Sequence, residues 1–132
     1  MMPIYSARSL SRLRTCDPRL IEVFEEVIKH FDCAILEGHR GEKEQTDHFL
    51  AGRSKVQFPN SKHNSTPSRA VDAAPYPINF KDRERFCVFA GLVMGIGLMK
   101  GVKIRWGGDW DQDTEVIDNG FDDLPHFEIV ED

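Results

Sequence analysis

The sequence has no apolar run of the roughly 20 residues that a membrane-spanning helix requires. Its most apolar stretch, residues 86–99, is shorter, contains glycines and has Lys and Arg close by, which is typical of a buried core helix. The N-terminus has no apolar segment before a small-residue cleavage site, so we expect no secretory signal. We therefore expect no membrane partner for this protein.

Cysteine and positive charge are also scarce. The three cysteines, Cys16, Cys33 and Cys87, are far apart and form no C-x-x-C pair, which argues against a disulfide framework and a Cys-rich zinc site. Cys33 and Cys87 stand in apolar runs and are expected to be buried, which suits folding in a reducing compartment. The net charge of −5 gives no sign of the basic face that a nucleic-acid binder needs.

The residues that are present suffice for one folded unit. A chain of 132 residues, 40% of them hydrophobic, has the size of one domain with one core. We expect a single, monomeric domain over residues 1–132, in which residues 1–16 form an N-terminal arm. In chain order, the apolar periodicity and the turn residues predict helices from Asp17-Pro18 through Phe31, at 42–51 and at 81–99, strands at 33–36, 69–73, 102–106 and 126–130, and a polar loop at 53–69.

The last of these strands has two different faces. Its residues alternate, so Phe127 and Ile129 would face the core while His126 and Glu128 share the opposite face. Because helices and strands mix without strict alternation, the expected fold class is α+β, with helices packed on a small, mainly antiparallel sheet.

Packing and helix ends do not explain two of the histidines, His63 and His126. His30 lies near a helix end, where positive charge is favoured, and His48 lies within a helix. His63 stands in the polar loop, where packing does not explain it, and His126 follows Asp123 by three residues.

These residues suit the chemistry of a catalytic zinc ion. Such an ion takes three protein ligands and leaves a fourth position for water, whose proton a nearby carboxylate accepts. His63, Asp72 and His126 could supply the ligands, and Asp123 the base. From spacing alone, an exposed His63 and an Asp72 that caps a turn are the favoured explanation.

Four segments, taken together, resemble a known family. In order they are Ser61-Lys-His63, Ala70-Val-Asp72, Trp106-Gly-Gly-Asp-Trp110 and Asp123-Leu-Pro-His126. They are similar to the S-x-H, A-x-D, Gly-Gly-Asp-Trp and D/E-x-x-H patterns of the zinc peptidases that include D-alanyl-D-alanine carboxypeptidases, vancomycin-resistance dipeptidases and phage L-alanyl-D-glutamate endolysins. The similarity covers roughly residues 33–130, and implies that the sheet carries a zinc site.

The resemblance implies one zinc ion per chain, bound by His63, Asp72 and His126, with Asp123 as the general base. One departure concerns the loop before Asp72. Eight residues separate His63 from Asp72, whereas six are usual in the family, and Ser68 stands near an expected glycine. A bulge in the loop can hold two added residues, because ligand geometry depends on the ends of the loop.

Family members also use an arginine in a Gly-x-Arg turn to stabilise the oxyanion, with a downstream glutamine. Arg40 and Gln45 match these positions, and Gln45 is expected to contact substrate. A guanidinium suits this role because it stays charged and donates hydrogen bonds in a fixed fork. The alternative for Arg40 is a surface ion pair with Glu42 or Glu44.

Other residues near the motifs have two interpretations each. Ser61 could bind substrate or cap the loop, and Trp110 could line a peptide groove or belong to the core. Asp109 could orient a zinc ligand from behind or hold its own glycine turn, and Glu128 could reach the site or form a cross-strand ion pair. An acidic stretch comprises Asp109, Asp111, Asp113, Glu115 and Asp118. It loosely resembles a calcium loop but lacks the central glycine and the terminal glutamate, which favours a solvated loop.

The resemblance implies a phage endolysin that cleaves the L-alanyl-D-glutamate bond of the peptidoglycan stem peptide. Such an enzyme is made in the host cytoplasm and acts in the periplasm and cell wall after release. The Arg-Trp-Gly-Gly-Asp-Trp turn and the lack of a signal or wall-binding module support this expectation. The alternatives are a D-alanyl-D-alanine carboxypeptidase or dipeptidase, and an inactive zinc-bearing binding module, which would need neither Asp123 nor Arg40.

Overall fold

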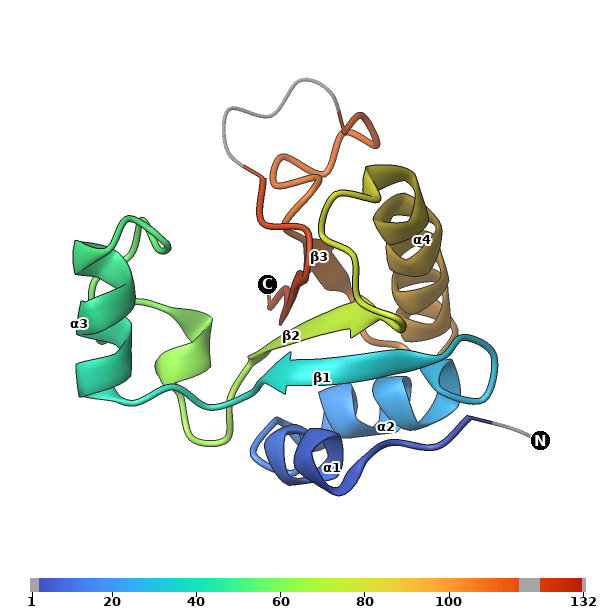
Figure 1. Ribbon diagram of the computed structural model, residues 1–132, viewed down its shortest axis with the longest axis horizontal. Helices are drawn as coiled ribbons and strands as arrows, with labels where there is room; N and C mark the ends of the chain where they lie inside the picture. The colour runs from blue at the N-terminus through green and yellow to red at the C-terminus, as the bar shows by residue number, and fades with distance from the viewer. Residues whose placement is uncertain (1–2, 117–121, 132) are drawn as a thin grey trace.

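The structure, a computed structural model, describes residues 3–116 and 122–131. In this part of the chain, four strands form one antiparallel sheet in the order β1-β2-β4-β3 (Figure 1). The strands are β1 (Cys33–Glu37), β2 (Ala70–Pro75), β3 (Ile104–Trp106) and β4 (His126–Ile129). The helices are α1 (Ala7–Leu13), α2 (Pro18–Val27), α3 (Glu42–Leu50) and α4 (Arg83–Met99), with a short 3-10 helix η1 (Lys62–Asn64). The predicted α+β class, with helices on a small antiparallel sheet, is confirmed.

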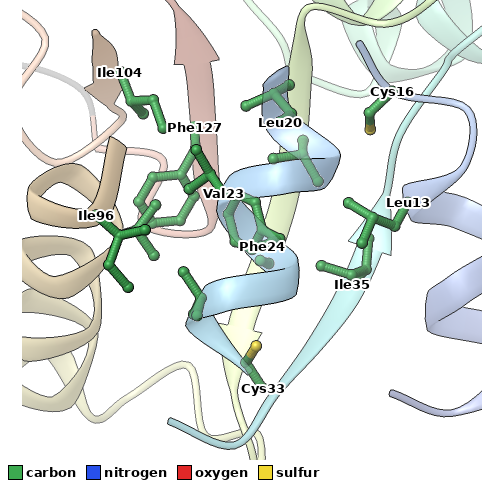
Figure 2. Packing of buried hydrophobic residues seen from close by; sticks show 14 of the residues in the cluster. Leu13, Cys16, Leu20, Val23, Phe24, Cys33, Ile35, Ile96, Ile104 and Phe127 are labelled. Atoms are coloured by element: carbon green, nitrogen blue, oxygen red, sulfur yellow. The ribbon is translucent and has the colours of Figure 1, made fainter. Parts of the chain in front are cut away.

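Helix α2 begins as the sequence predicts. The Asp17 side chain accepts a hydrogen bond from the Arg19 backbone N–H at 2.9 Å, and Pro18 takes the first helical position. The apolar stripe of α2 is buried, and Phe24 meets Phe127 of β4 edge to face at 5.9 Å. Figure 2 shows Phe24 of α2 between Ile96 of α4 on one side and Ile35 of β1 on the other, so this helix fills the centre of the core.

The two faces of β4 have different environments, as the alternating pattern predicts. Phe127 and Ile129 belong to the hydrophobic core, which lies between the sheet and helices α2 and α4. His126 and Glu128 face a cleft on the other side of the sheet. In Figure 1, α3 stands apart from the other helices, beyond the end of β1. The 3-10 helix η1 contributes His63 to this cleft, and the segment before α3 contributes Arg40.

The expectation of an arm at residues 1–16 needs correction, because this segment contains helix α1. Ser6 caps the helix by accepting from the Ser9 backbone N–H at 3.1 Å, and Leu13 is buried against the side of β1. A helix of seven residues is too short to show a repeating apolar stripe. The polar loop at 53–69 likewise contains η1.

The remaining features concern membrane spans and cysteines. Within residues 3–116 and 122–131, no helix is long and apolar enough to cross a membrane. All three cysteines are free thiols, with Cys16 and Cys33 buried and Cys87 half-buried.

Candidate metal centre

Three predicted ligands come together at the end of the sheet. Asp72 of β2 and His126 of β4 are direct partners across the antiparallel pair. His63 enters from η1, whose backbone is tied to the β1–α3 connection by a hydrogen bond from Arg40 N to His63 O at 2.8 Å. The candidate ligand atoms are His63 Nε2, Asp72 Oδ1 and His126 Nδ1, which lie 3.2 to 3.4 Å from one another.

Each histidine has its other ring nitrogen engaged. His63 Nδ1 lies 2.7 Å from the Gly38 carbonyl oxygen, and His126 Nε2 lies 2.8 Å from Glu128 Oε1. Both partners accept hydrogen bonds, so these nitrogens carry the protons. The lone pairs of His63 Nε2 and His126 Nδ1 are thereby directed at the shared point beside Asp72.

This arrangement fits a tetrahedral zinc ion. Ligands about 2.0–2.1 Å from zinc at tetrahedral angles lie roughly 3.3 Å from each other, which is the spacing the three atoms have. Two histidines and one carboxylate are also a donor set that zinc takes in catalytic sites. His63, Asp72 and His126 form a group of described residues that could hold a metal ion.

The electrostatics of the group also favour a cation. Burial alone would raise the pKa of Asp72, but attraction to His63 and hydrogen bonds with both histidines hold it well below its usual range. Burial alone would lower the pKa of His126, yet its bonds to Asp72 and Glu128 raise it to about 9. Without a metal, a proton on His126 therefore supplies positive charge at the centre.

Asp123, the predicted base, lines the same cleft as His63 and His126. Burial and the nearby Asp72 carboxylate raise its pKa above the ordinary value, although the two histidines and Arg40 oppose this. A higher pKa makes the carboxylate a better proton acceptor near neutral pH. The geometry allows the base role, which remains a prediction.

The Gly-Gly-Asp-Trp turn explains where Asp123 sits. The Asp123 backbone N–H donates to Gly107 O at 2.8 Å, and a Cβ on Gly107 would lie 2.0 Å from the Asp123 carbonyl oxygen. A Cβ on Gly108 would meet the Trp106 ring at 2.4 Å. Gly107 is therefore required for close packing between this turn and the segment that carries Asp123, and Gly108 leaves room for the Trp106 ring.

Arg40 is buried, and its partners differ from those considered in the sequence. Its guanidinium donates to both oxygens of Glu37, at 3.0 and 2.7 Å, and lies 3.7 Å from Asp72 Oδ2. Gln45, fully buried, accepts from Arg40 Nη1 at 2.8 Å and donates to Val56 O. The surface ion pair is therefore wrong, because the side chain turns inward toward Glu37. A direct substrate contact by Gln45 remains a prediction.

The remaining candidates lie around a cleft of about 450 Å³. Ser61 lines it and also caps η1 by accepting from the His63 N–H. Trp110 lines it with its ring 5.1 Å from that of His126. Glu128 orients His126 and also forms the cross-strand ion pair, with Arg105 at 2.7 Å. Glu128 thus reaches the site and forms the ion pair at once, whereas Ser61 caps the 3-10 helix and its contact with substrate remains a prediction.

The longer loop between His63 and Asp72 is anchored at both ends. Ser68 is buried, its N–H donates to Thr15 O at 2.9 Å, and its hydroxyl donates to Ala70 O at 2.6 Å. The bond to Thr15 ties the loop to the α1–α2 junction, and the bond to Ala70 ties it to the start of β2. With this longer loop in place, the atoms of His63, Asp72 and His126 lie 3.2 to 3.4 Å from one another.

Asp109 serves its own turn. Its carboxylate accepts from the backbone N–H groups of Asp113 at 3.2 Å and Thr114 at 3.0 Å. This is the structural role considered for it, and contact with a zinc ligand stays a prediction. Carboxylate oxygens of Asp109, Asp111 and Asp113 cluster, while Asp118 of the acidic stretch lies outside the described residues.

Three polar residues of this region have no role in the sequence interpretation. Glu37 faces Asp72 across β1 and β2 after an irregularity in the register, and it binds Arg40. Lys62 and Arg105 both contact Glu128. Only strand register could have revealed Arg105, which pairs with Glu128 across β3 and β4.

Comparisons with known proteins agree with this geometry. A family model described as phage L-alanyl-D-glutamate peptidase matches residues 1–130. The L-alanyl-D-glutamate peptidase of Escherichia phage T5 is 28% identical over an aligned region of 134 residues. This region covers 96% of this chain and 97% of the relative. The crystal structure of the Serratia marcescens L-Ala D-Glu endopeptidase ChiX is similar with a TM-score of 0.76 and 25% identity, over 96% of this chain and 90% of that one.

Proposed function

The chain belongs to the phage L-alanyl-D-glutamate peptidase family, and we propose that it is a zinc-dependent endolysin that cleaves the L-alanyl-D-glutamate bond of the peptidoglycan stem peptide. The observation that carries the zinc requirement is the mutual spacing of 3.2 to 3.4 Å among His63 Nε2, Asp72 Oδ1 and His126 Nδ1. It is supported by the second hydrogen bond of each histidine, which leaves the correct nitrogen free for a metal.

Zinc at this centre would act as a Lewis acid and lower the pKa of a water molecule toward about 7. The protein supplies the proton acceptor and the charge around it. Asp123 accepts a proton from the attacking water, and the same carboxyl can then donate it to the leaving nitrogen of D-glutamate. Its raised pKa suits both halves of this transfer.

Arg40 stabilises the charge that develops on the carbonyl oxygen of L-alanine. Three of its five N–H groups are bound to Glu37 and Gln45, which fixes the guanidinium plane and leaves two donors. A donor held in place before the reaction costs no reorganisation when the oxyanion forms. Arg40, Ser61 and Trp110 line the cleft, so we assign the substrate peptide to it.

The place of action follows from this substrate. We propose that the enzyme, a single-domain monomer, is made in the host cytoplasm and reaches the cell wall after release. Both relatives named above are L-alanyl-D-glutamate peptidases, which favours this bond over the D-alanyl-D-alanine bond.

Digestion of purified Gram-negative sacculi tests the proposal, with muropeptides identified by mass spectrometry. We expect zinc-loaded enzyme to create new N-terminal D-glutamate, and chelation to stop the reaction. Release of D-alanine would instead identify a carboxypeptidase, and intact sacculi after digestion with zinc-loaded protein would identify an inactive binding module.

A further inference from the structure

The cleft has a charge opposite to that of the chain. The chain carries a net charge of −5, yet among the described residues that line the cleft, cations outnumber carboxylates. The cations are Arg40, Arg53, Lys55, Lys62 and Arg105, and the carboxylates are Asp123 and Glu128. Walls of one charge concentrate the potential inside a cleft, so this one attracts anionic groups.

Two of these cations share one carboxylate. Lys62 Nζ lies 3.2 Å and Arg105 Nη2 lies 2.7 Å from the same oxygen, Glu128 Oε2. The other oxygen of Glu128 accepts from His126 Nε2 at 2.8 Å. One carboxylate therefore cannot neutralise both cations, and a positive charge remains on the wall of the cleft that Lys62 and Arg105 form. The side chains of Lys62 and Arg105 stay 27% and 32% exposed, so a ligand can reach them.

The wall is also held in place. Lys62 donates to the Ile129 carbonyl oxygen, and the Arg105 guanidinium lies over the Trp110 ring at 5.7 Å. Arg105 Nε and Trp110 Nε1 are buried donors without a hydrogen-bond partner in the described part of the chain. Unpaired buried donors are rare in folded proteins, and here both belong to residues that line the cleft. Lys62 and Arg105 thus form a pre-organised cationic pair with donors to spare.

The proposed substrate supplies a matching group. Glutamate has two carboxyl groups, and only one of them can continue the peptide, so the other remains as a free carboxylate a few bonds from the scissile nitrogen. We infer that Lys62 and Arg105 bind this carboxylate and select an acidic residue after the scissile bond. The inference rests on the proposed function, because it concerns the substrate of the same cleft.

Arg40 is unsuited to this role. It is buried, Glu37 at 2.7 Å and Gln45 occupy three of its N–H groups, and the two that remain are assigned to the oxyanion. Arg40 therefore acts beside Asp72 on the oxyanion, and the pair of Lys62 and Arg105 recognises the charge of the substrate.

Two synthetic stem peptides test the inference. They are identical except that the free carboxylate of D-glutamate in one is a carboxamide in the other. For wild-type enzyme loaded with zinc, we expect kcat/KM to be about tenfold or more higher for the acid, as charge-assisted hydrogen bonds predict. In Lys62→Gln and Arg105→Gln, this ratio should fall toward one, mainly through loss of activity on the acid.

Control variants separate recognition from structural damage. Lys43→Gln removes an exposed lysine of α3, paired with Asp47, and should leave the ratio unchanged. Lys62→Arg keeps the charge and should restore most of the preference. Equal losses on both peptides in Lys62→Gln, or no preference in the wild type, would overturn the inference.

Binding separates this inference from the proposed function. Both peptides are also titrated calorimetrically into wild-type protein and Lys62→Gln, which requires no turnover. If wild-type protein cleaves neither peptide but binds the acid more tightly, and Lys62→Gln loses that difference, the proposed reaction is wrong while the carboxylate site stands. Equal binding of acid and amide by wild-type protein overturns the carboxylate site.

Discussion

Each histidine of the metal group uses its second ring nitrogen to fix its orientation, and Glu128 does this for His126. In Glu128→Gln, the neutral amide is a weaker acceptor than the carboxylate bonded at 2.8 Å. We expect zinc affinity to fall about 10- to 100-fold, as is typical when such a supporting carboxylate is lost. Competition with a chromophoric chelator measures this. Glu131→Gln, at an exposed ion pair with Arg69, is the control and should bind zinc as the wild type does.

Asp123 and His126 should respond differently to removal. Asp123→Asn keeps the shape of the side chain but cannot accept the proton, so kcat should fall about 10²- to 10⁴-fold while one zinc remains bound. His126→Ala removes a ligand atom, so both zinc and activity should be lost. Metal content by elemental analysis and turnover of a stem peptide distinguish the two. Full activity of Asp123→Asn would show that another group is the base.

The pH dependence of zinc binding should follow His126. Hydrogen bonds to Asp72 and Glu128 raise the pKa of this histidine to about 9, so the metal-free protein carries a proton there at neutral pH. Zinc must displace it. The apparent affinity should therefore rise about tenfold per pH unit and level off above about pH 9. Calorimetry in buffers of different ionisation enthalpy would count the released protons, and a pH-independent affinity would contradict the shift.

The sequence predicts the candidate ligands of the site better than it predicts the residues that hold those side chains in place. Asp72 and His126 belong to short local patterns, which remain visible without knowledge of the fold. Glu37 and Arg105 act only through neighbours on adjacent strands, and a single sequence does not reveal strand register. The resemblance identifies Arg40, but its pairing with Glu37 depends on an irregularity in the register of β1 that the residue types do not predict.

At the scale of elements, the turn after β3 should tolerate no side chain at position 107. In Gly107→Ala, the new Cβ would lie 2.0 Å from the Asp123 carbonyl oxygen, so the backbone that carries Asp123 must move. We expect a loss of about 1–3 kcal/mol in unfolding free energy, typical of overpacking. Activity should fall further, by roughly 100-fold, because small displacements of catalytic groups are costly. Denaturant unfolding and kcat measure the two effects.

Helix α4 provides the matched control for that glycine. Gly95 is exposed within the helix, and a Cβ there would meet no atom within 4 Å. Gly95→Ala should therefore stabilise the protein by about 0.5–1 kcal/mol, because glycine loses more backbone freedom in a helix than alanine does. Activity should not change. A destabilised Gly95→Ala would show that α4 bends at this position in a way that alanine resists.

The sequence predicts the helices of nine or more residues but not the shorter ones. Helix α2 has a cap, a first-turn proline and a full apolar stripe, which agree with one another. Helix α1 and η1 have seven and three residues, so neither completes the two turns over which a stripe repeats. Their positions are set by contacts with distant segments, such as the bond from Arg40 N to His63 O.

At the scale of the molecule, the sheet assembles a site from residues that are far apart in the chain. β2 and β4 bring Asp72 opposite His126, and η1 adds His63 through a loop anchored by Ser68. Spacing alone could not give these contacts, since the length of the His63–Asp72 loop says little about where its ends meet. The resemblance supplied the missing long-range information.

The same core that supports the sheet should protect two of the three thiols. Burial raises the pKa of Cys16 to about 12 and that of Cys33 to about 11, so the reactive thiolate is nearly absent from both at pH 8. Cys87 is only half-buried on α4. A disulfide reagent should therefore modify one thiol rapidly in the native protein and three in denaturant. Cys87→Ser should abolish the rapid phase; rapid modification of Cys16 or Cys33, identified by peptide mapping, would show that the core opens locally.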